Sequence, residues 1–495
     1  MQSPNVLLIT SDQQRADHLG LAGMRAIPTP NLDRLGREGM HVARAYTASP
    51  LCTPARVSLL TGQYPSVHGA TSIGVTADPF PQDLITYRLK AAGYTTALFG
   101  KAHFVARPDE EAHVLGREAS GPRDFEGFDG PYIGFDHVRL SRGHTINTVP
   151  DMHYRLWLER QGVDYKQWFP QLGGNYDHHA AGPWDIPAEL HDTHWVTEEA
   201  LAWLKTREGQ AAPWFCWASY QDPHEPHVCP EPWYSRVDPA EVVPYAGARS
   251  GEFDDKPPFY AEAARGDWSR YNDGVVVPCC FRTPERDARR AACLQATYGM
   301  IGFLDHAVGR LIHALEAAGQ LENTLIIYTS DHGDMHGHHG FWGKGLPAYE
   351  DAQRVPLLIA GAGVKAQGSR PALANLVDLP ATILDCCGAA PAPAMQGVSL
   401  RPLLSGETDS VQQHTFVECQ ATEHVLQETL ISDRLKLVAI RGDDNGELYD
   451  LEADPDQYRN LWNDAGYTWM RMTMQGELVR RAARHPRVGK RKAFA

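Results

Sequence analysis

Long apolar runs are absent from this sequence of 495 residues. No stretch approaches the roughly 18 uninterrupted apolar residues that a membrane-spanning helix needs, so we expect no membrane segment. The N-terminus enters the short apolar run Val6–Ile9 without a cationic lead, whereas a secretory signal has both a cationic lead and a longer apolar core. These two absences together predict a cytoplasmic protein.

A surplus of positive charge is absent as well. The chain carries 46 Lys and Arg against 61 Asp and Glu, which gives a formal net charge of −15. A field of this sign does not attract a polyphosphate backbone, so we expect no nucleic-acid partner. The one basic run, Arg480–Lys492, lies at the C-terminus, where a solvated tail is expected. An oligomer-docking arm is the alternative, which leaves a homo-oligomer open.

The number and spacing of the cysteines do not fit a disulfide framework. The chain has nine cysteines, an odd number, and two pairs of them are adjacent, Cys279-Cys280 and Cys386-Cys387. A scattered odd set in a long chain is typical of a reducing compartment. What is present is ordinary globular composition, with 43% hydrophobic and 22% charged residues, which is enough apolar material for a large core.

One pattern occurs three times along the chain: a short β-rich apolar run is followed at once by polar residues. The three runs and their polar ends are Asn5–Thr10 before Ser11–Gln14, Trp214–Tyr220 before Gln221–His224, and Thr324–Thr329 before Ser330–Gly333. Buried parallel strands have this pattern. Because open α/β sheets bind ligands at the carboxyl ends of their strands, we expect these Asp, Gln and His side chains to meet at one edge.

Segments between the predicted strands have apolar residues at helical spacing, and this alternation predicts the fold class. Apolar residues recur at helical spacing through Arg289–Ala318, so strand and long helix alternate as in a doubly wound α/β fold. Residues 104–190 carry many Gly, Pro, His and Trp without periodicity and are predicted to be long loops that shape the substrate pocket. Their Trp157, Trp168 and Trp184 could stack on a ring, but packing is the expected role of each.

The pattern changes after residue 375. A helical run at Leu376–Leu384 is followed by a Pro, Ala and Gly-rich link and by short strand patterns at Thr415–Cys419 and Leu435–Ile440. We therefore predict a catalytic α/β domain at residues 1–375 and a smaller α+β domain with a terminal tail at residues 376–495.

The segment Ser49–Gly62 is the most informative stretch of the chain. Within it Cys52, Pro54 and Arg56 have the spacing Cys-x-Pro-x-Arg. This segment resembles the signature of the sulfatase family, which is part of the alkaline phosphatase superfamily. The resemblance implies an alkaline-phosphatase-like α/β fold, with a large central sheet that is mixed but mostly parallel and is flanked by helices. In that family a formylglycine-generating enzyme oxidises the Cys to formylglycine, whose aldehyde hydrates to a geminal diol. The resemblance implies that Cys52 is the precursor of the nucleophile and that such an enzyme is a partner during maturation.

The modification has a chemical purpose. A serine that attacked a sulfate ester would be left as a stable serine sulfate, which water removes slowly. In a diol, one hydroxyl attacks the sulfur, and deprotonation of the other then expels sulfate by breaking a carbon–oxygen bond and restoring the aldehyde. For Cys52 alone, the competing interpretation is a small buried residue before a proline turn.

Two further matches imply a metal site. Asn5–Gln13 resembles the family's opening strand with its metal ligands, and Asp331–Gly333 resembles the second half-site. The ligands implied are Asp12, Gln13, Asp331, His332 and the formylglycine at Cys52. A set of carboxylate and amide oxygens with one imidazole is suited to Ca²⁺, and the imidazole nitrogen makes Mn²⁺ possible as well. For Asp331 alone, a helix N-cap is the structural alternative.

The remaining catalytic residues are also implied by resemblance. Lys101 and His103 match a Gly-Lys-x-His element, His224 matches a Pro-His-x-Pro element, and Lys344 matches a lysine of the family. Lys101 would bind the diol or sulfate oxygens, and His103 would be the base that expels sulfate. His224 and Lys344 would grip the sulfate and help to protonate the leaving oxygen. Arg56 would anchor the nucleophile or the metal-bound carboxylates.

Other segments are assigned no catalytic role. Thr29–Leu35 and Leu448–Pro455 resemble structural segments of the family. Four further histidines have no counterpart in the family elements and are predicted to be loop residues: His227, His336, His338 and His339.

The metal pairs depart from those of many arylsulfatases. Those enzymes carry Asp-Asp and Asp-Asn, whereas this chain has Asp12-Gln13 and Asp331-His332, which look more like phosphonate monoester hydrolases and choline sulfatases. Phosphonate monoester hydrolases replace the Lys and His of the Gly-Lys-x-His element with Tyr and Thr. This chain keeps both, so a bacterial-type arylsulfatase that hydrolyses sulfate monoesters is the favoured function.

Two alternatives stand beside this function. The first is a phosphonate monoester hydrolase or phosphodiesterase with promiscuous sulfatase activity. The second is a sulfate-ester or glycan-binding pseudoenzyme, which requires that Cys52 is never modified. The leaving alcohol stays open among aryl, alkyl, choline-like and sugar groups.

Overall fold

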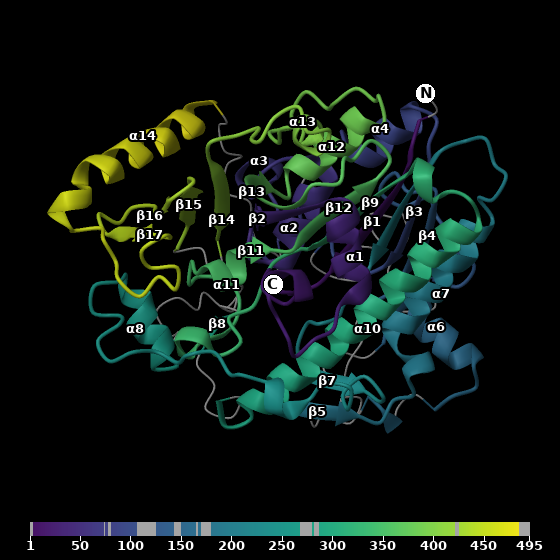
Figure 1. The fold of residues 1–495 in the computed structure, drawn as a ribbon, viewed down its shortest axis with the longest axis horizontal. Helices are drawn as coiled ribbons and strands as arrows, with labels where there is room; N and C mark the ends of the chain where they lie inside the picture. The colour runs from purple at the N-terminus through teal and green to yellow at the C-terminus, as the bar shows by residue number, and fades with distance from the viewer. Residues whose placement is uncertain are drawn as a thin grey trace.

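The computed structural model describes most of the chain. The described residues are 3–73, 75–77, 81–105, 125–142, 150–164, 167–169, 180–267, 280–281, 287–420 and 425–484. A large sheet crosses the molecule with helices packed against it, and a smaller C-terminal part with a long helix lies at one end (Figure 1).

The large sheet is mixed but mostly parallel. Its order is β11-β2-β12-β9-β1-β6-β3-β4, and β13 also pairs with β2. Its strands are β1 (Asn5–Ser11), β2 (Met40–Tyr46), β3 (Thr95–Gly100), β4 (His137–Leu140), β6 (Trp214–Ser219), β9 (Thr324–Ser330), β11 (Arg354–Val355), β12 (Leu357–Gly361) and β13 (Gly368–Asn375). The run β9-β1-β6-β3-β4 is parallel throughout, and β12 lies antiparallel between β9 and β2. The expected fold class is confirmed.

Both faces of the sheet are buried because strand residues alternate between two hydrophobic layers. Val6 and Leu8 of β1 pack with α2 (Cys52–Thr61), α4 (Ile85–Ala91), α12 (Asp378–Cys386) and α13 (Arg401–Leu404). Leu7 and Ile9 pack on the other face with α1 (Pro30–Glu38), α6 (Met152–Arg160), α7 (Asp192–Lys205) and α10 (Arg290–Ala317). This double burial explains why the strand patterns read as continuous apolar runs.

Smaller elements surround the sheet. They are α3 (Pro65–His68), α8 (Pro258–Ala264), α11 (Glu350–Gln353), the parallel pair β5 (Ala181–Trp184) and β7 (His227–Pro230), and the antiparallel pair β8 (Cys280–Phe281) and β10 (Trp342–Gly343). Short 3-10 helices span Gly20–Ala22, Ala188–Leu190, Pro239–Glu241, Leu321–Asn323, His338–Gly340 and Ala465–Tyr467.

The C-terminal part contains a second, antiparallel sheet. Its strands are β14 (Thr415–Cys419), β15 (Gln427–Ile431), β16 (Leu435–Ile440) and β17 (Gly446–Asp450), in that order. The helix α14 (Thr468–Arg484) packs on it through Met474 and Leu478. The expectation of a smaller α+β domain is confirmed, and its boundary at residue 375 stays a prediction.

Two expectations need correction. Residues 104–190 were expected to be loops, but their described parts include the core strand β4, the helix α6 and the strand β5. These elements are short, and β4 is an edge strand, so their periodicity is weak. Within the basic run, Arg481 is not solvated: it belongs to α14 and pairs with Glu418 at 2.5 Å, with a side chain 9% exposed. Residues 485–492 of that run lie outside the described residues.

One other expectation is met by the described residues. Trp184 is buried in the layer beneath the sheet, and Trp157 and Trp168 pack against that layer, as expected of packing residues. In the described part of the chain, no helix is both long enough and apolar enough to cross a membrane.

Candidate active site

The three predicted strand ends meet at one edge of the large sheet. β1 lies between β6 and β9, and Thr10 of β1 is in register with Ser219 on one side and Thr329 on the other. Beyond the strands, the backbone NH of Asp12 donates to the carbonyl of Asp222 at 3.1 Å. This register brings together polar residues that are more than 200 positions apart in the chain.

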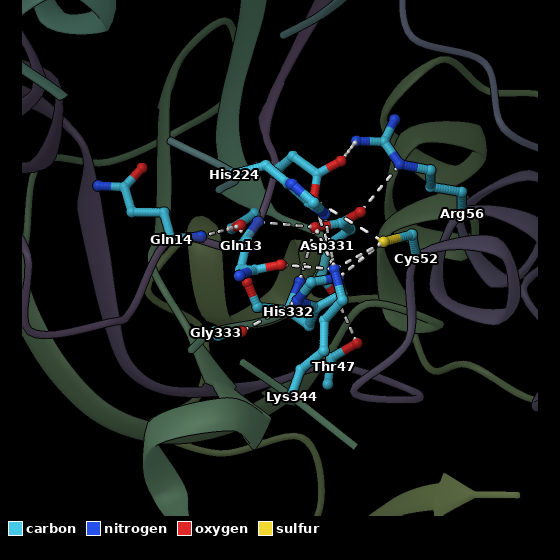
Figure 2. A network of polar contacts seen from close by, with 12 residues as sticks. Gln13, Gln14, Thr47, Cys52, Arg56, His224, Asp331, His332, Gly333 and Lys344 are labelled. Carbon is cyan, nitrogen blue, oxygen red and sulfur yellow. Dashed lines mark hydrogen bonds and ion pairs between the residues drawn. The ribbon is translucent and has the colours of Figure 1, made fainter. Parts of the chain in front are cut away.

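Cys52 is the first residue of α2, where the helix presents unpaired backbone NH groups. Its side chain is 2% exposed. Its Sγ lies 3.1 Å from Nε2 of His332, 3.1 Å from Nζ of Lys344 and 3.9 Å from Oδ1 of Asp12. Figure 2 shows His332 and Lys344 close to the sulfur of Cys52. A helix N-terminus favours negative charge, so this position suits a group that reacts as an anion.

Arg56 lies one helical turn after Cys52 and is fully buried. Its Nε donates to Asp331 at 2.9 Å and a terminal nitrogen donates to Asp12 at 3.2 Å. The other terminal nitrogen donates to the Lys101 carbonyl at 3.0 Å and to the Ser219 hydroxyl at 2.8 Å. A planar guanidinium can make all these contacts at once, and a lysine cannot. Arg56 therefore joins the ends of β1, β3, β6 and β9 into one site.

Cations surround Asp12. Lys101 forms an ion pair with Asp12 on the side where Arg56 also binds it. Burial alone would raise the pKa of Asp12, but Lys101, His224, Arg56 and Lys344 outweigh it and hold that pKa well below its usual value. Asp12 is therefore a carboxylate at neutral pH.

Gln13 is held in one orientation by partners at both ends of its carboxamide. Its oxygen accepts a hydrogen bond from Nζ of Lys344 at 2.5 Å. Its nitrogen donates to Oε2 of Glu225 at 2.5 Å and to a carboxylate oxygen of Asp334. Carboxylates accept and do not donate, so they fix the nitrogen on their side and turn the oxygen toward Cys52 and Lys344.

Two histidines each have one ring nitrogen oriented by a carbonyl. His332 places Nδ1 3.0 Å from the Gly333 carbonyl, and His224 places Nδ1 2.7 Å from the Glu225 carbonyl. A carbonyl only accepts, so Nδ1 carries a hydrogen in both rings. Burial lowers the pKa of His332, and the nearby Lys344 adds to the effect of burial. Its neutral Nε2 faces Cys52, whereas Nε2 of His224 lies 3.0 Å from Nζ of Lys344.

His103 lies two residues beyond Lys101, at a positive φ of 51°. Among the described residues, it is the one predicted site residue outside this hydrogen-bond network, and its buried Nδ1 has no hydrogen-bond partner there. Burial lowers the pKa of His103 well below its usual value, and Lys101 and Arg142 add to that effect. The ring is therefore neutral and able to accept a proton.

Four of the predicted ligands suit a divalent cation. Asp12, Cys52, Asp331 and His332 each offer a ligand atom, and these atoms lie within 4.8 Å of one another. Two carboxylates and an imidazole with its lone pair turned inward are donors that bind such ions, and the oxygen of Gln13 faces the same space. The residues present therefore fit a metal ion.

Several residues that contact the site were missed by sequence reasoning. Glu225 and Asp334 bind Gln13, Ser219 binds Arg56, and the Thr47 hydroxyl donates to the Asp331 carbonyl at 2.5 Å. Asp334 directly follows a matched motif and Glu225 lies inside one, so their positions in the sequence could have indicated them. The sequence does not show which way their side chains point.

The prediction for four other histidines was wrong in part. His227 belongs to β7, and it is buried together with His336, His338 and His339. Their burial was missed because a polar loop is normally exposed, whereas this one is covered by aromatic residues such as Trp342 and Tyr349.

A mostly parallel sheet with this constellation at its carboxyl edge is the architecture of an alkaline phosphatase superfamily hydrolase. The sulfatase profile matches residues 4–389, and the profile of the N-sulphoglucosamine sulphohydrolase C-terminal region matches residues 337–484. The chain belongs to the sulfatase family and is an enzyme of the sulfuric ester hydrolase class.

Relatives cover nearly the whole chain. The arylsulfatase of Clostridium perfringens is 29% identical over 94% of this chain and 91% of its own length. The choline-sulfatase of Rhizobium meliloti is 30% identical over 92% of this chain and 82% of its own length. The crystal structure of the phosphonate monoester hydrolase of Agrobacterium radiobacter superimposes with a TM-score of 0.75 at 26% identity, over 97% of this chain and 96% of that one.

Proposed function

We propose that the protein hydrolyses sulfate monoesters through a formylglycine made from Cys52. One observation carries this proposal: Sγ of Cys52 lies 3.1 Å from both Nε2 of His332 and Nζ of Lys344, at the start of a helix. In the mature enzyme, the oxygens of the formylglycine hydrate would take the place of this sulfur. A nucleophilic oxygen there would be surrounded by groups that stabilise negative charge.

Asp12, Gln13, Asp331 and His332 would hold one divalent metal ion, Ca²⁺ by preference or Mn²⁺. Such an ion supplies positive charge that stabilises an ionised hydroxyl and the sulfate oxygens. Arg56 would keep Asp12 and Asp331 in place, because it contacts both carboxylates.

The other residues would divide the reaction between them. Lys344 and His224, whose Nζ and Nε2 lie 3.0 Å apart, would bind the sulfate and assist departure of the leaving oxygen. Lys101 would bind the sulfate or the diol. His103, neutral and with an unpartnered buried nitrogen among the described residues, would take the proton of the second hydroxyl when sulfate is expelled.

The direct test is the mass of the peptide that contains Cys52. Protein matured in a host with a formylglycine-generating enzyme should yield a peptide carrying an aldehyde in place of the thiol, at a lower mass. Protein from a host without that enzyme should keep the thiol and be inactive toward 4-nitrophenyl sulfate. An unmodified Cys52 in a fully active sample would overturn the proposal and would also remove the case for a maturation partner.

Replacing His103 with Ala is expected to slow the second step of the reaction. General-base assistance is worth about 10²- to 10⁴-fold in rate, so sulfate release should slow by that factor. Attack on the sulfur should be affected far less. Rapid mixing with 4-nitrophenyl sulfate should show a stoichiometric burst of nitrophenol, then a slow phase, with a sulfated peptide trapped at position 52.

The matched control for this variant is His313→Ala, because the His313 side chain is 82% exposed. It should keep the wild-type time course. If His103→Ala shows no burst and accumulates no sulfated peptide, His103 acts in substrate binding and the assignment is wrong.

The second candidate function is hydrolysis of phosphonate monoesters or phosphodiesters. The solved phosphonate monoester hydrolase that covers nearly the whole chain supports it, and a monoanionic diester resembles a sulfate monoester in charge and shape. The ratio of kcat/KM for an aryl sulfate over the matched aryl phosphonate separates the two. A ratio above one favours the sulfatase function. The presence of Lys101 and His103 also favours it, because phosphonate monoester hydrolases have Tyr and Thr at these positions.

A further inference from the structure

The predicted site has a buried floor and a partly exposed rim. Asp12 and Asp331 are fully buried and Lys344 is 3% exposed. His224 and Glu225 are only partly buried, although their neighbours on both sides in the chain are buried. A substrate must enter where side chains reach solvent, so His224 and Glu225 belong to the opening of the site.

Glu225 is held close to the reacting atoms by a short chain of contacts. Its Oε2 accepts from the Gln13 nitrogen at 2.5 Å, and the Gln13 oxygen accepts from Lys344 at 2.5 Å. The same Lys344 nitrogen lies 3.1 Å from Sγ of Cys52. The carboxylate of Glu225 therefore lies one side chain away from the groups around the nucleophile.

Glu225 is not needed to fix the orientation of the Gln13 side chain. Asp334 also accepts from the Gln13 nitrogen, is fully buried, and is itself fixed by the backbone NH of His336 at 2.6 Å and of Gly343 at 3.1 Å. One buried carboxylate is enough to turn the amide. A second, partly exposed carboxylate at the entrance of the site repels the sulfate group and attracts positive charge, so it favours a substrate whose other part is cationic.

We propose that Glu225 is a specificity-determining residue that selects sulfate esters whose alcohol part carries a positive charge. This inference rests on the sulfatase function proposed above, in which His224, the residue before Glu225, lies beside the leaving oxygen. A cationic alcohol bound next to His224 would bring its charge to the carboxylate of Glu225. In a partly desolvated site, unit charges a few Å apart attract strongly enough to change a rate or equilibrium by about tenfold or more.

The experiment compares two esters that differ in charge and not in shape, choline O-sulfate and 3,3-dimethylbutyl sulfate, on the metal-loaded, matured enzyme. The wild type should have a kcat/KM at least about tenfold higher for the cationic ester. Glu225→Gln should bring this ratio close to one, because an amide keeps the size of the side chain and loses its charge. The loss should appear mainly as a higher KM for choline O-sulfate.

The matched control is Glu231→Gln, since Glu231 lies in the same segment, is exposed and binds only Ser235 among the hydrogen bonds of the described residues. It should leave the ratio unchanged. Calorimetry with Ca²⁺ gives a second readout: Glu225→Gln should keep its metal affinity within about threefold of the wild type, because Asp334 still holds Gln13.

Two results would overturn the proposal. One is a wild type that does not prefer the cationic ester. The other is a Glu225→Gln variant that loses rate equally on both esters together with metal affinity, which would make Glu225 a positioning residue for Gln13. Turnover of 4-nitrophenyl sulfate by the wild type tests the sulfatase function separately, since that ester carries no cation.

Discussion

Replacing Cys52 with Ala should abolish sulfate ester hydrolysis, by about 10⁴-fold or more, because the variant has no atom that can be converted into the nucleophile. The fold should survive. Cys52 is small and lies at the first position of α2, so the lost contacts should cost only about 1 kcal/mol of unfolding free energy. Initial rates with 4-nitrophenyl sulfate and a thermal melt measure the two effects.

Cys216→Ala is the matched control for this variant. Cys216 is fully buried in β6, inside the hydrophobic layer beneath the sheet. Its replacement should cost similar or greater stability and leave turnover within a few-fold of the wild type. Turnover by Cys52→Ala within a few-fold of the wild type would rule out a nucleophile made at position 52.

Removing the metal ion with a strong chelator should lower the rate by about 10³-fold or more, and Ca²⁺ or Mn²⁺ should restore it. The ion would add positive charge between Asp12, Asp331 and the nucleophile beyond the charge of Arg56, Lys101 and Lys344. Because the ion binds the folded state alone, Ca²⁺ at 100 times its dissociation constant should also raise the free energy of unfolding by about 2.7 kcal/mol. Activity assays and melts of chelated and reloaded protein measure both.

The variant Asp331→Asn should weaken metal binding, because it removes one of the two carboxylates that the site offers a cation. It also removes the charge that pairs with Arg56. Asp433→Asn is the control, since the Asp433 side chain is 90% exposed, and it should bind metal as the wild type does. Full activity of a metal-free sample, or unchanged Ca²⁺ affinity of Asp331→Asn, would show that the ligands are elsewhere.

Much of the fold was predictable because it depends on local pattern. The strands β1, β6 and β9 and the helix α10 were expected at nearly the residues where they occur, since a strand buried on both faces is a continuous apolar run. The edge strand β4 was missed, because a strand of four residues is too short to show a clear periodicity. The buried histidines near η8 (His338–Gly340) were missed because part of their cover comes from distant segments, through Tyr245 and Tyr458.

The sequence by itself indicated the family to which the chain belongs and most of the residues of the candidate site. Those conclusions rest on residue types at fixed spacing, such as Cys52 and Arg56 one helical turn apart.

Only the tertiary structure decided how these residues act on one another. It showed that Arg56 bridges Asp12 and Asp331, that the oxygen of Gln13 accepts a hydrogen bond from Lys344, and that the carboxylate of Glu225 accepts one from the nitrogen of Gln13. Charge and hydrogen bonding depend on distance, orientation and burial, and these arise where strands hundreds of residues apart become neighbours in one sheet.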